Sequence, residues 1–99
     1  MTQTLMRALT IVNKKGLHAR ASARFVSVTE AHDARATVRR DGLEVSGDSI
    51  MGLMMLAAAP GTEIEIACDG HDAEAALEGL AAMVEAGFDE DRAEFPAAK

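Results

Sequence analysis

The chain has 99 residues, a formal net charge of −6 and one cysteine. This length allows one compact domain with a core but not two, and a lone cysteine excludes an internal disulfide framework. The acidic balance argues against nucleic acid as a partner, and the lack of a signal-peptide pattern or a membrane-length apolar run favours a cytoplasmic protein without a membrane partner.

The first predicted elements are a strand and a helix. Residues 5–12 alternate in polarity, with Leu9 and Ile11 expected to face inward, and "NKKG" then breaks the strand. From Ala19 to about Glu30 the apolar spacing becomes helical. The expected buried stripe of this helix is Ala19, Ala23 and Val26.

The segment "ATVRRDGLEV" predicts a β-hairpin. Two short β-branched runs flank Asp41-Gly42, a pair that tolerates the positive φ angles of a tight turn. Val38 and Val45 are expected to lie on the same face of this hairpin.

Two helices and a strand are predicted in the second half of the chain. Ser49 can cap a short helix that runs to about Ala58 and is ended by Pro60-Gly61. The strictly alternating "TEIEIAC" predicts a strand, and Asp72 can cap a longer helix to about Ala86 that Gly87 closes. The expected core-facing residues are Ile64, Ile66 and Cys68 on the strand, and Leu77, Leu80, Ala81 and Val84 on the helix.

The resulting order, βαββαβα, indicates an α+β fold. We expect a four-stranded antiparallel sheet with three helices on one face and water on the other. A single domain is expected over residues 1–88, followed by a frayed tail over residues 89–99.

The short helix "SIMGLMML" is more apolar than a helix of a small domain can bury. An overpacked core is one interpretation. The favoured one is a docking surface for a partner protein, because methionine adapts its shape to different partners.

His18 stands out from His32 and His71, which we interpret as solvated residues near helix ends. No Cys or His lies at metal-ligand spacing from it, and no hydrolytic triad is apparent, so a metal site is not expected. What remains is nucleophilic attack on phosphorus. The N–H groups and dipole of a following helix form an anion site, Arg20 adds a donor fork, and Gly16 allows a sharp bend. A helix terminus stabilises a nearby negative charge by about 0.3–1 kcal/mol. This energy does little to activate the imidazole as a base, but it acts on both negative charges of a phosphoryl group. The site is therefore better suited to stabilising a phosphorylated state.

Two stretches together resemble one family. "GLHARASARF" resembles the active-site signature of HPr, the histidine phosphocarrier of the bacterial phosphotransferase system, and "DSIMGLMML" resembles its regulatory-serine segment at the usual interval. The resemblance covers nearly the whole chain and implies the HPr open-faced β-sandwich. It implies a monomeric phosphoryl carrier rather than an enzyme, without cofactor.

The resemblance also implies roles for individual residues. His18 would accept phosphate from enzyme I at Nδ1 and pass it to a IIA-type protein, with Arg20 assisting the phosphoryl group. Ser49 would be phosphorylated by HPr kinase/phosphorylase. The implied partner-binding residues are Ala19, Ala21, Arg24, Phe25, Ile50, Met51 and Met54.

Two positions depart from the family pattern. Ala21 stands where the family usually has proline, which would preset the first helical turn. Asp48 precedes Ser49 where many relatives have lysine, and its carboxylate would disfavour a phosphate on that serine. The "HARAS" form is similar to HPr proteins of regulatory or nitrogen-linked phosphotransferase chains.

Two other functions stay open at this point. One is a regulatory interaction module that acts through phosphoserine at Ser49 without carrier activity. The other is a small enzyme such as an acyl-phosphate hydrolase, although no catalytic Asn or general base is apparent at the His18 loop. Cys68 is expected to pack in the core without chemistry.

Overall fold

The computed structural model describes residues 4–93. Its elements are β1 (Leu5–Thr10), α1 (Ala19–Glu30), β2 (Arg35–Arg40), β3 (Leu43–Ser46), α2 (Ile50–Met55), β4 (Glu63–Asp69), α3 (Ala73–Glu85) and a short 3-10 helix, η1 (Gly87–Asp89). The predicted βαββαβα order is confirmed, and η1 is an addition to it.

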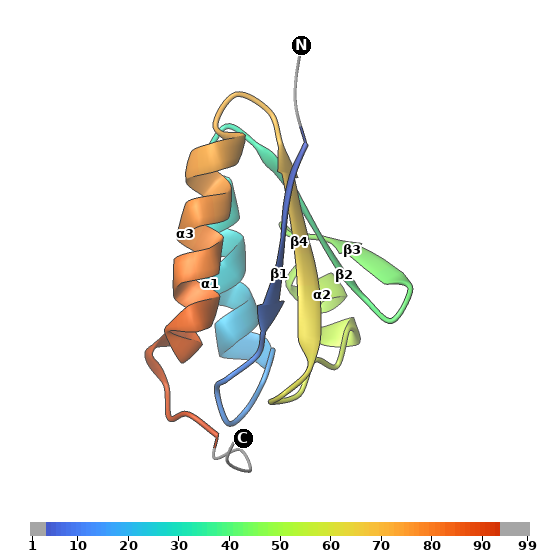
Figure 1. The fold of residues 1–99 in the computed structure, drawn as a ribbon, viewed down its shortest axis with the longest axis vertical. Coiled ribbons are helices and arrows are strands. Elements are labelled where there is room, and N and C mark those ends of the chain that lie inside the picture. The colour runs from blue at the N-terminus through green and yellow to red at the C-terminus, as the bar shows by residue number, and fades with distance from the viewer. Residues whose placement is uncertain (1–3, 94–99) are drawn as a thin grey trace.

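The four strands form one antiparallel sheet in the order β1-β4-β2-β3. Figure 1 shows α1 and α3 side by side across one face of this sheet, with α2 beside the end of α1 and the β3 edge. The α+β architecture predicted from the order of the elements is therefore confirmed. No helix within residues 4–93 covers the other face.

The β2–β3 hairpin forms as its turn residues predict. Asp41 and Gly42 have φ angles of 51° and 81°, and Val38 pairs with Val45 across the two strands. Asp is one of the non-glycine residues that adopt this left-handed conformation readily.

The buried face of α1 differs from the predicted stripe. Ala19 is exposed and Ala23 is half-buried, whereas Phe25 is completely buried. The helix is turned to place Phe25, its largest apolar side chain, in the core, because this removes more apolar area from water than burying two alanines. The buried residues of α1 are Ala21, Ser22, Phe25, Val26 and Thr29.

The other predicted core positions are confirmed. The three inward residues of β4 and the predicted stripe of α3 are buried, as are Leu9 and Ile11. These side chains form one core between the sheet and the helices. Cys68 is buried among them, and burial raises the pKa of its thiol.

One helix boundary and one helix cap differ from the prediction. The α2 helix ends at Met55, before Ala57 takes a positive φ of 51°, so it is shorter than expected. Asp72 precedes α3 but makes no side-chain cap there. Its Oδ2 instead accepts from the backbone N–H of Asp33 at 2.9 Å, a contact that joins the two loops at that end of the molecule.

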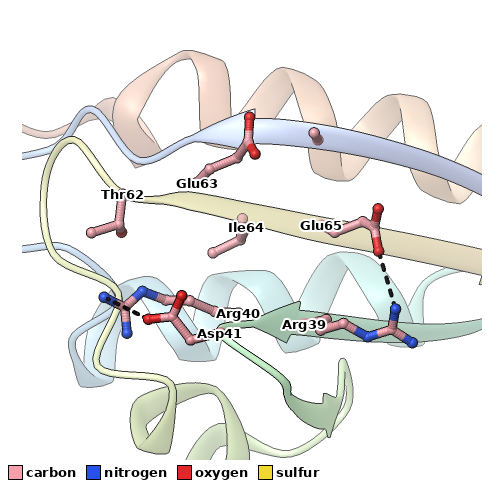
Figure 2. A pocket seen from close by; sticks show the side chains of 8 residues that line it. Arg39, Arg40, Asp41, Thr62, Glu63, Ile64 and Glu65 are labelled. Carbon is pink, nitrogen blue, oxygen red and sulfur yellow. Dashed lines mark hydrogen bonds and ion pairs between the residues drawn. The ribbon is translucent and has the colours of Figure 1, made fainter.

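The uncovered face of the sheet carries charges of both signs, several of them in ion pairs. Figure 2 shows a shallow hollow on this face, with Arg39 reaching toward Glu65 at 3.4 Å. Arg39 also pairs with Glu44 at 2.7 Å, and Arg40 lies 3.7 Å from Asp41. The hollow is thus lined by two arginines and by the carboxylates of Asp41, Glu63 and Glu65, and the exposed ion pairs among them contribute little to stability.

The described part of the predicted tail is paired rather than frayed. The backbone N–H of Lys14 donates to Asp91 at 2.8 Å, Ala93 donates to Val12 at 2.9 Å, and Asn13 forms a β-bridge with Arg92. Residues 94–99 of that prediction lie outside the described residues, and the domain boundary at residue 88 stays a prediction. None of the helices within residues 4–93 is long and apolar enough to cross a membrane.

Candidate functional site

His18 is the N-cap residue of α1. Its backbone is extended (φ −79°, ψ −178°), and its carbonyl accepts from the N–H of Ser22 at 2.8 Å, which begins the helix. Its Nδ1 accepts from the backbone N–H of Arg20 at 3.3 Å. This hydrogen bond places Nδ1 at the helix N-terminus, and the side chain as a whole is 23% exposed. The prediction that His18 stands where a helix begins is confirmed.

The bend before His18 depends on Gly16. This residue has a φ of +64°, and a Cβ added to it would lie 2.3 Å from the carbonyl oxygen of Ala58. Only glycine fits so close to a neighbouring backbone in this conformation. The carbonyl of Gly16 accepts from the side-chain amide of Asn13 at 2.8 Å, which fixes the turn from the inside.

The second ring nitrogen of His18 contacts Glu90. Nε2 lies 2.9 Å from Oε1 and 2.8 Å from Oε2 of this carboxylate. The amide nitrogen of Asn13 donates to the same Oε1 at 3.1 Å. Figure 1 shows why residues so distant in sequence can meet: the segment after α3 runs to the same end of the molecule as the loop after β1.

The hydrogen bonds of His18 define its tautomer. A backbone N–H can only donate, so Nδ1 is the acceptor and carries a lone pair. An ionised carboxylate can only accept, so Nε2 carries the proton that is shared between the oxygens of Glu90. The ring nitrogen at the helix N-terminus is therefore the nucleophilic one.

Glu90 is held in its ionised form. Desolvation by burial acts to raise the pKa of this carboxyl, but the hydrogen bonds from His18 and Asn13, together with the positive charge of Arg20, outweigh it. The net result is a pKa below the ordinary value for glutamate. Its side chain is only 14% exposed, which limits screening of these contacts by solvent.

The turn after α3 places Glu90 on the ring. Gly87, Phe88 and Asp89 have φ angles of 66°, 56° and 58°, which reverse the chain at the end of the helix. Phe88 is completely buried, and its carbonyl accepts from the Arg24 guanidinium at 2.7 Å. Burial of the phenyl ring offsets the strain of two non-glycine residues in the left-handed region.

A cleft with charges of both signs lies beside the ring. Its lining residues are Lys14, Lys15, Arg20, Arg24, Asp89, Glu90 and Asp91. The basic residues of the loop and of α1 thus lie together in this cleft. Within residues 4–93, no group of three or more His, Cys, Asp or Glu side chains is arranged to hold a metal ion.

Ser49 is the N-cap of α2. Its Oγ accepts from the backbone N–H of Gly52 at 2.9 Å, as the predicted cap requires. The neighbouring Asp48 carboxylate accepts from the Ser46 hydroxyl at 2.6 Å. Asp48 is thus engaged with the preceding strand, although its charge still lies one residue from Ser49.

The short helix presents an exposed apolar surface, here called the methionine patch. It consists of Ile50, Met51, Met54 and Met55, with 39%, 71%, 39% and 66% of each residue exposed. Leu53 and Leu56 supply the buried side of the segment. The expectation that this segment cannot bury all its apolar side chains is confirmed.

The predicted partner-binding residues divide into two groups. Ala19, Arg24, Ile50, Met51 and Met54 are exposed. Ala21 and Phe25 are completely buried in the core face of α1, so they cannot offer surface to a partner. The prediction for these two residues is wrong, because the buried face of α1 is rotated from the expected one.

Sequence reasoning missed Asn13 and Glu90. Asn13 is completely buried, and its Oδ1 has no hydrogen-bond partner among the described residues. A buried, partly unsatisfied amide is retained at a cost of about 1–3 kcal/mol, which is typical of a functional site. No local pattern marks either residue, since Glu90 lies 72 positions from His18 and 77 from Asn13.

Residues 5–86 of this chain match the family described as the PTS HPr component phosphorylation site. The chain belongs to the HPr family. It is 42% identical over 87 residues to the phosphocarrier protein HPr of Xylella fastidiosa, an alignment that covers 88% of this chain and 98% of the relative. It is 41% identical over 86 residues to the phosphocarrier protein NPr of Shewanella violacea, covering 87% and 94%.

The fold of this HPr-family chain also matches solved structures. The crystal structure of HPr-C-His from Thermoanaerobacter tengcongensis superimposes with a TM-score of 0.84 at 33% identity, over 88% of this chain and 98% of that one. The chain is therefore a phosphocarrier of the HPr/NPr type in the phosphotransferase system, and not a classical enzyme. Proteins of this family interact with the enzymes of that system.

Proposed function

We propose that His18 is the phosphoryl acceptor of this phosphocarrier and that Nδ1 is the atom phosphorylated. The position of Nδ1 carries the proposal, because this lone pair lies at the N-terminus of a twelve-residue helix, where backbone N–H groups and the helix dipole favour negative charge. Arg20 follows two residues later with an exposed side chain free to approach phosphate oxygens.

In this proposal His18 receives the phosphoryl group from enzyme I and passes it to a IIA-type protein in the cytoplasm. The methionine patch and Arg24 lie on exposed surface and would contact these partners. Relatives with both HPr and NPr names are similar to this chain, and the "HARAS" sequence supports a nitrogen-linked or regulatory branch.

Incubation with enzyme I and phosphoenolpyruvate tests the assignment. We expect one acid-labile phosphate on the wild type and on His71→Ala, and none on His18→Ala. His71 is an exposed histidine outside the site, so it controls for loss of an unrelated ring. Labelling that persists in His18→Ala would contradict the proposal.

Ser49 supports a second role, regulation by HPr kinase/phosphorylase. This serine is half-buried at the start of α2 and adjoins the methionine patch, so a phosphate there would change the charge beside the docking surface. Incubation with ATP and the kinase should give an acid-stable phosphate that is lost in Ser49→Ala. Acid-stable labelling without any labelling of His18 would favour a regulatory module without carrier activity.

A further inference from the structure

The contact between Glu90 and His18 lies on the side of the ring opposite the proposed phosphoryl site. Both carboxylate oxygens face Nε2, at 2.9 and 2.8 Å, whereas Nδ1 faces the N–H of Arg20. We propose that Glu90 is a positioning residue that holds the Nε2 proton and stabilises the cationic ring formed when Nδ1 carries a phosphoryl group. This inference rests on the proposed function of His18.

Phosphoryl acceptance changes the charge of the ring. The Nδ1 lone pair forms a bond to phosphorus while the bond between phosphorus and the donor breaks, and that electron pair stays with the donor. The ring keeps its Nε2 proton and gains a positive charge. The hydrogen bond to Glu90 therefore becomes one between opposite charges, which is roughly twice as strong as a neutral one. When the group moves on, the electron pair returns to Nδ1 and the ring is neutral again.

Glu90 also repels a phosphoryl group, so the two effects must be compared. The carboxylate touches the ring at 2.8 Å, while a phosphoryl group on Nδ1 would lie beyond the opposite edge of the ring. Coulombic energies fall with distance, and Lys14, Lys15 and Arg20 line the same cleft as Glu90 and offset its charge. The attraction to the cationic ring therefore prevails.

Glu90 is fixed before any phosphate arrives. Asn13 donates to its Oε1 at 3.1 Å, its own N–H donates to Gly87 at 3.0 Å, and the next residues pair with the loop after β1. Buried Phe88 anchors the turn that precedes it. A carboxylate that is already in place needs no rearrangement when positive charge develops on the ring. Glu90 can therefore stabilise the cationic ring throughout phosphoryl transfer.

The stabilisation of the cationic ring by Glu90 depends on pH, because the phosphorylated ring can also lose its Nε2 proton. The charged and titratable groups around the ring are Lys14 and Lys15 from the loop, Arg20 and Arg24 from α1, and Asp89, Glu90 and Asp91 from the C-terminal segment. Glu90 is the one that makes a side-chain hydrogen bond to the ring among the described residues. Asp91→Asn removes from the same cleft a carboxylate that makes no hydrogen bond or ion pair with the ring among the described residues, and therefore serves as the matched control.

The unphosphorylated protein gives the first test. In ¹H–¹⁵N NMR of the histidine ring, we expect the wild type and Asp91→Asn to show a proton on Nε2 of His18 that is protected from solvent exchange, and Glu90→Ala to lose that protection at least tenfold. A wild-type ring protonated on Nδ1, or equal protection in Glu90→Ala, would overturn the inference. This result does not depend on carrier activity.

The phosphorylated protein gives the second test. Wild type, Glu90→Gln and Asp91→Asn are labelled with enzyme I and phosphoenolpyruvate, separated from the donor, and followed for phosphate loss between about pH 5 and 9. When the Nδ1–phosphorus bond breaks, a ring that is protonated on Nε2 leaves as neutral imidazole, whereas a ring without that proton must leave as an anion. We therefore expect Glu90→Gln to lose phosphate about tenfold more slowly near pH 8, and to approach the wild-type rate at acid pH.

The outcomes separate the two proposals. Asp91→Asn should follow the wild-type profile within about twofold, since its side chain makes no hydrogen bond or ion pair with the ring among the described residues. A labelled wild type with an identical profile in Glu90→Gln, or an equal rate change at every pH, would overturn the role of Glu90 alone. A wild type that takes up no phosphate would overturn the proposed function of His18, and this inference with it.

Discussion

Gly16 lies directly against the carbonyl of Ala58, where a Cβ would come within 2.3 Å of the oxygen. The same carbonyl accepts from the N–H of Leu17 at 3.1 Å. The loop that presents His18 therefore packs against the segment that follows α2. This contact fixes the position of the proposed phosphoryl site relative to the helix that carries the methionine patch.

Gly16→Ala should destabilise the protein strongly. The new methyl group requires the backbone near Ala58 to move, in addition to the roughly 1–2 kcal/mol that a side chain costs at positive φ. We expect a loss of about 3 kcal/mol or more in urea unfolding. Gly42→Ala is the matched control, because Gly42 also has a positive φ but a Cβ there meets no atom within 4 Å. Equal losses in the two variants would contradict the packing argument.

Arg20→Ala should slow phosphoryl acceptance without affecting the fold. Its side chain is exposed and makes no hydrogen bond among the described residues, so the free energy of unfolding should change by less than about 0.5 kcal/mol. Loss of its donors to phosphate should lower the rate of labelling by about tenfold. Arg35→Ala, beyond the other end of α1, should label at the wild-type rate. An unchanged rate in Arg20→Ala removes Arg20 from the mechanism.

Acid should weaken the attachment of the C-terminal segment. The pKa of Glu90 is lowered in the folded protein, so its contacts stabilise the fold above the ordinary glutamate value of about 4.3, and this contribution is lost as the pH falls through the folded value. The difference in unfolding free energy between wild type and Glu90→Gln should therefore shrink as the pH falls from about 5 to about 3. If the difference in unfolding free energy stays constant or grows as the pH falls, the pKa of Glu90 is not lowered in the folded protein.

Substitutions of Ser49 should separate capping from regulation. Ser49→Ala removes the acceptor for the Gly52 N–H and should cost about 1 kcal/mol in thermal or urea unfolding. Ser49→Asp keeps a capping oxygen, so its stability should stay close to that of the wild type. Its added charge beside the methionine patch should nevertheless slow phosphoryl transfer to His18. Equal transfer rates for Ser49→Asp and wild type would count against a regulatory phosphate.

The methionine patch should act in partner binding and contribute little to stability. Met51 is 71% exposed, so Met51→Lys should leave the unfolding transition in place while raising the KM of the labelling reaction for this protein. Met6→Lys offers a control, because Met6 is 53% exposed but lies on β1, away from α2. A KM that rises equally in both variants would indicate a general charge effect.

Local patterns were sufficient for most of the fold. Alternation identified β4, Asp41-Gly42 identified the hairpin, and Ser49 was correctly expected to cap α2, because each signal depends on neighbours within a few residues. The bounds of α1 were also as expected. Its buried face was not, since that depends on which side chain the sheet and the other helices have room to cover.

Sequence by itself determined the βαββαβα order and the loop-to-helix position of His18, and its resemblance to HPr supplied the family. Only the tertiary structure decided the surroundings of the imidazole. Glu90 reaches Nε2 because buried Phe88 and the pairing of the C-terminal segment with the loop after β1 return the chain to the start of α1. Such a contact closes a loop of more than seventy residues, and no short-range pattern encodes it, because its free energy comes from side chains that meet only in the folded molecule.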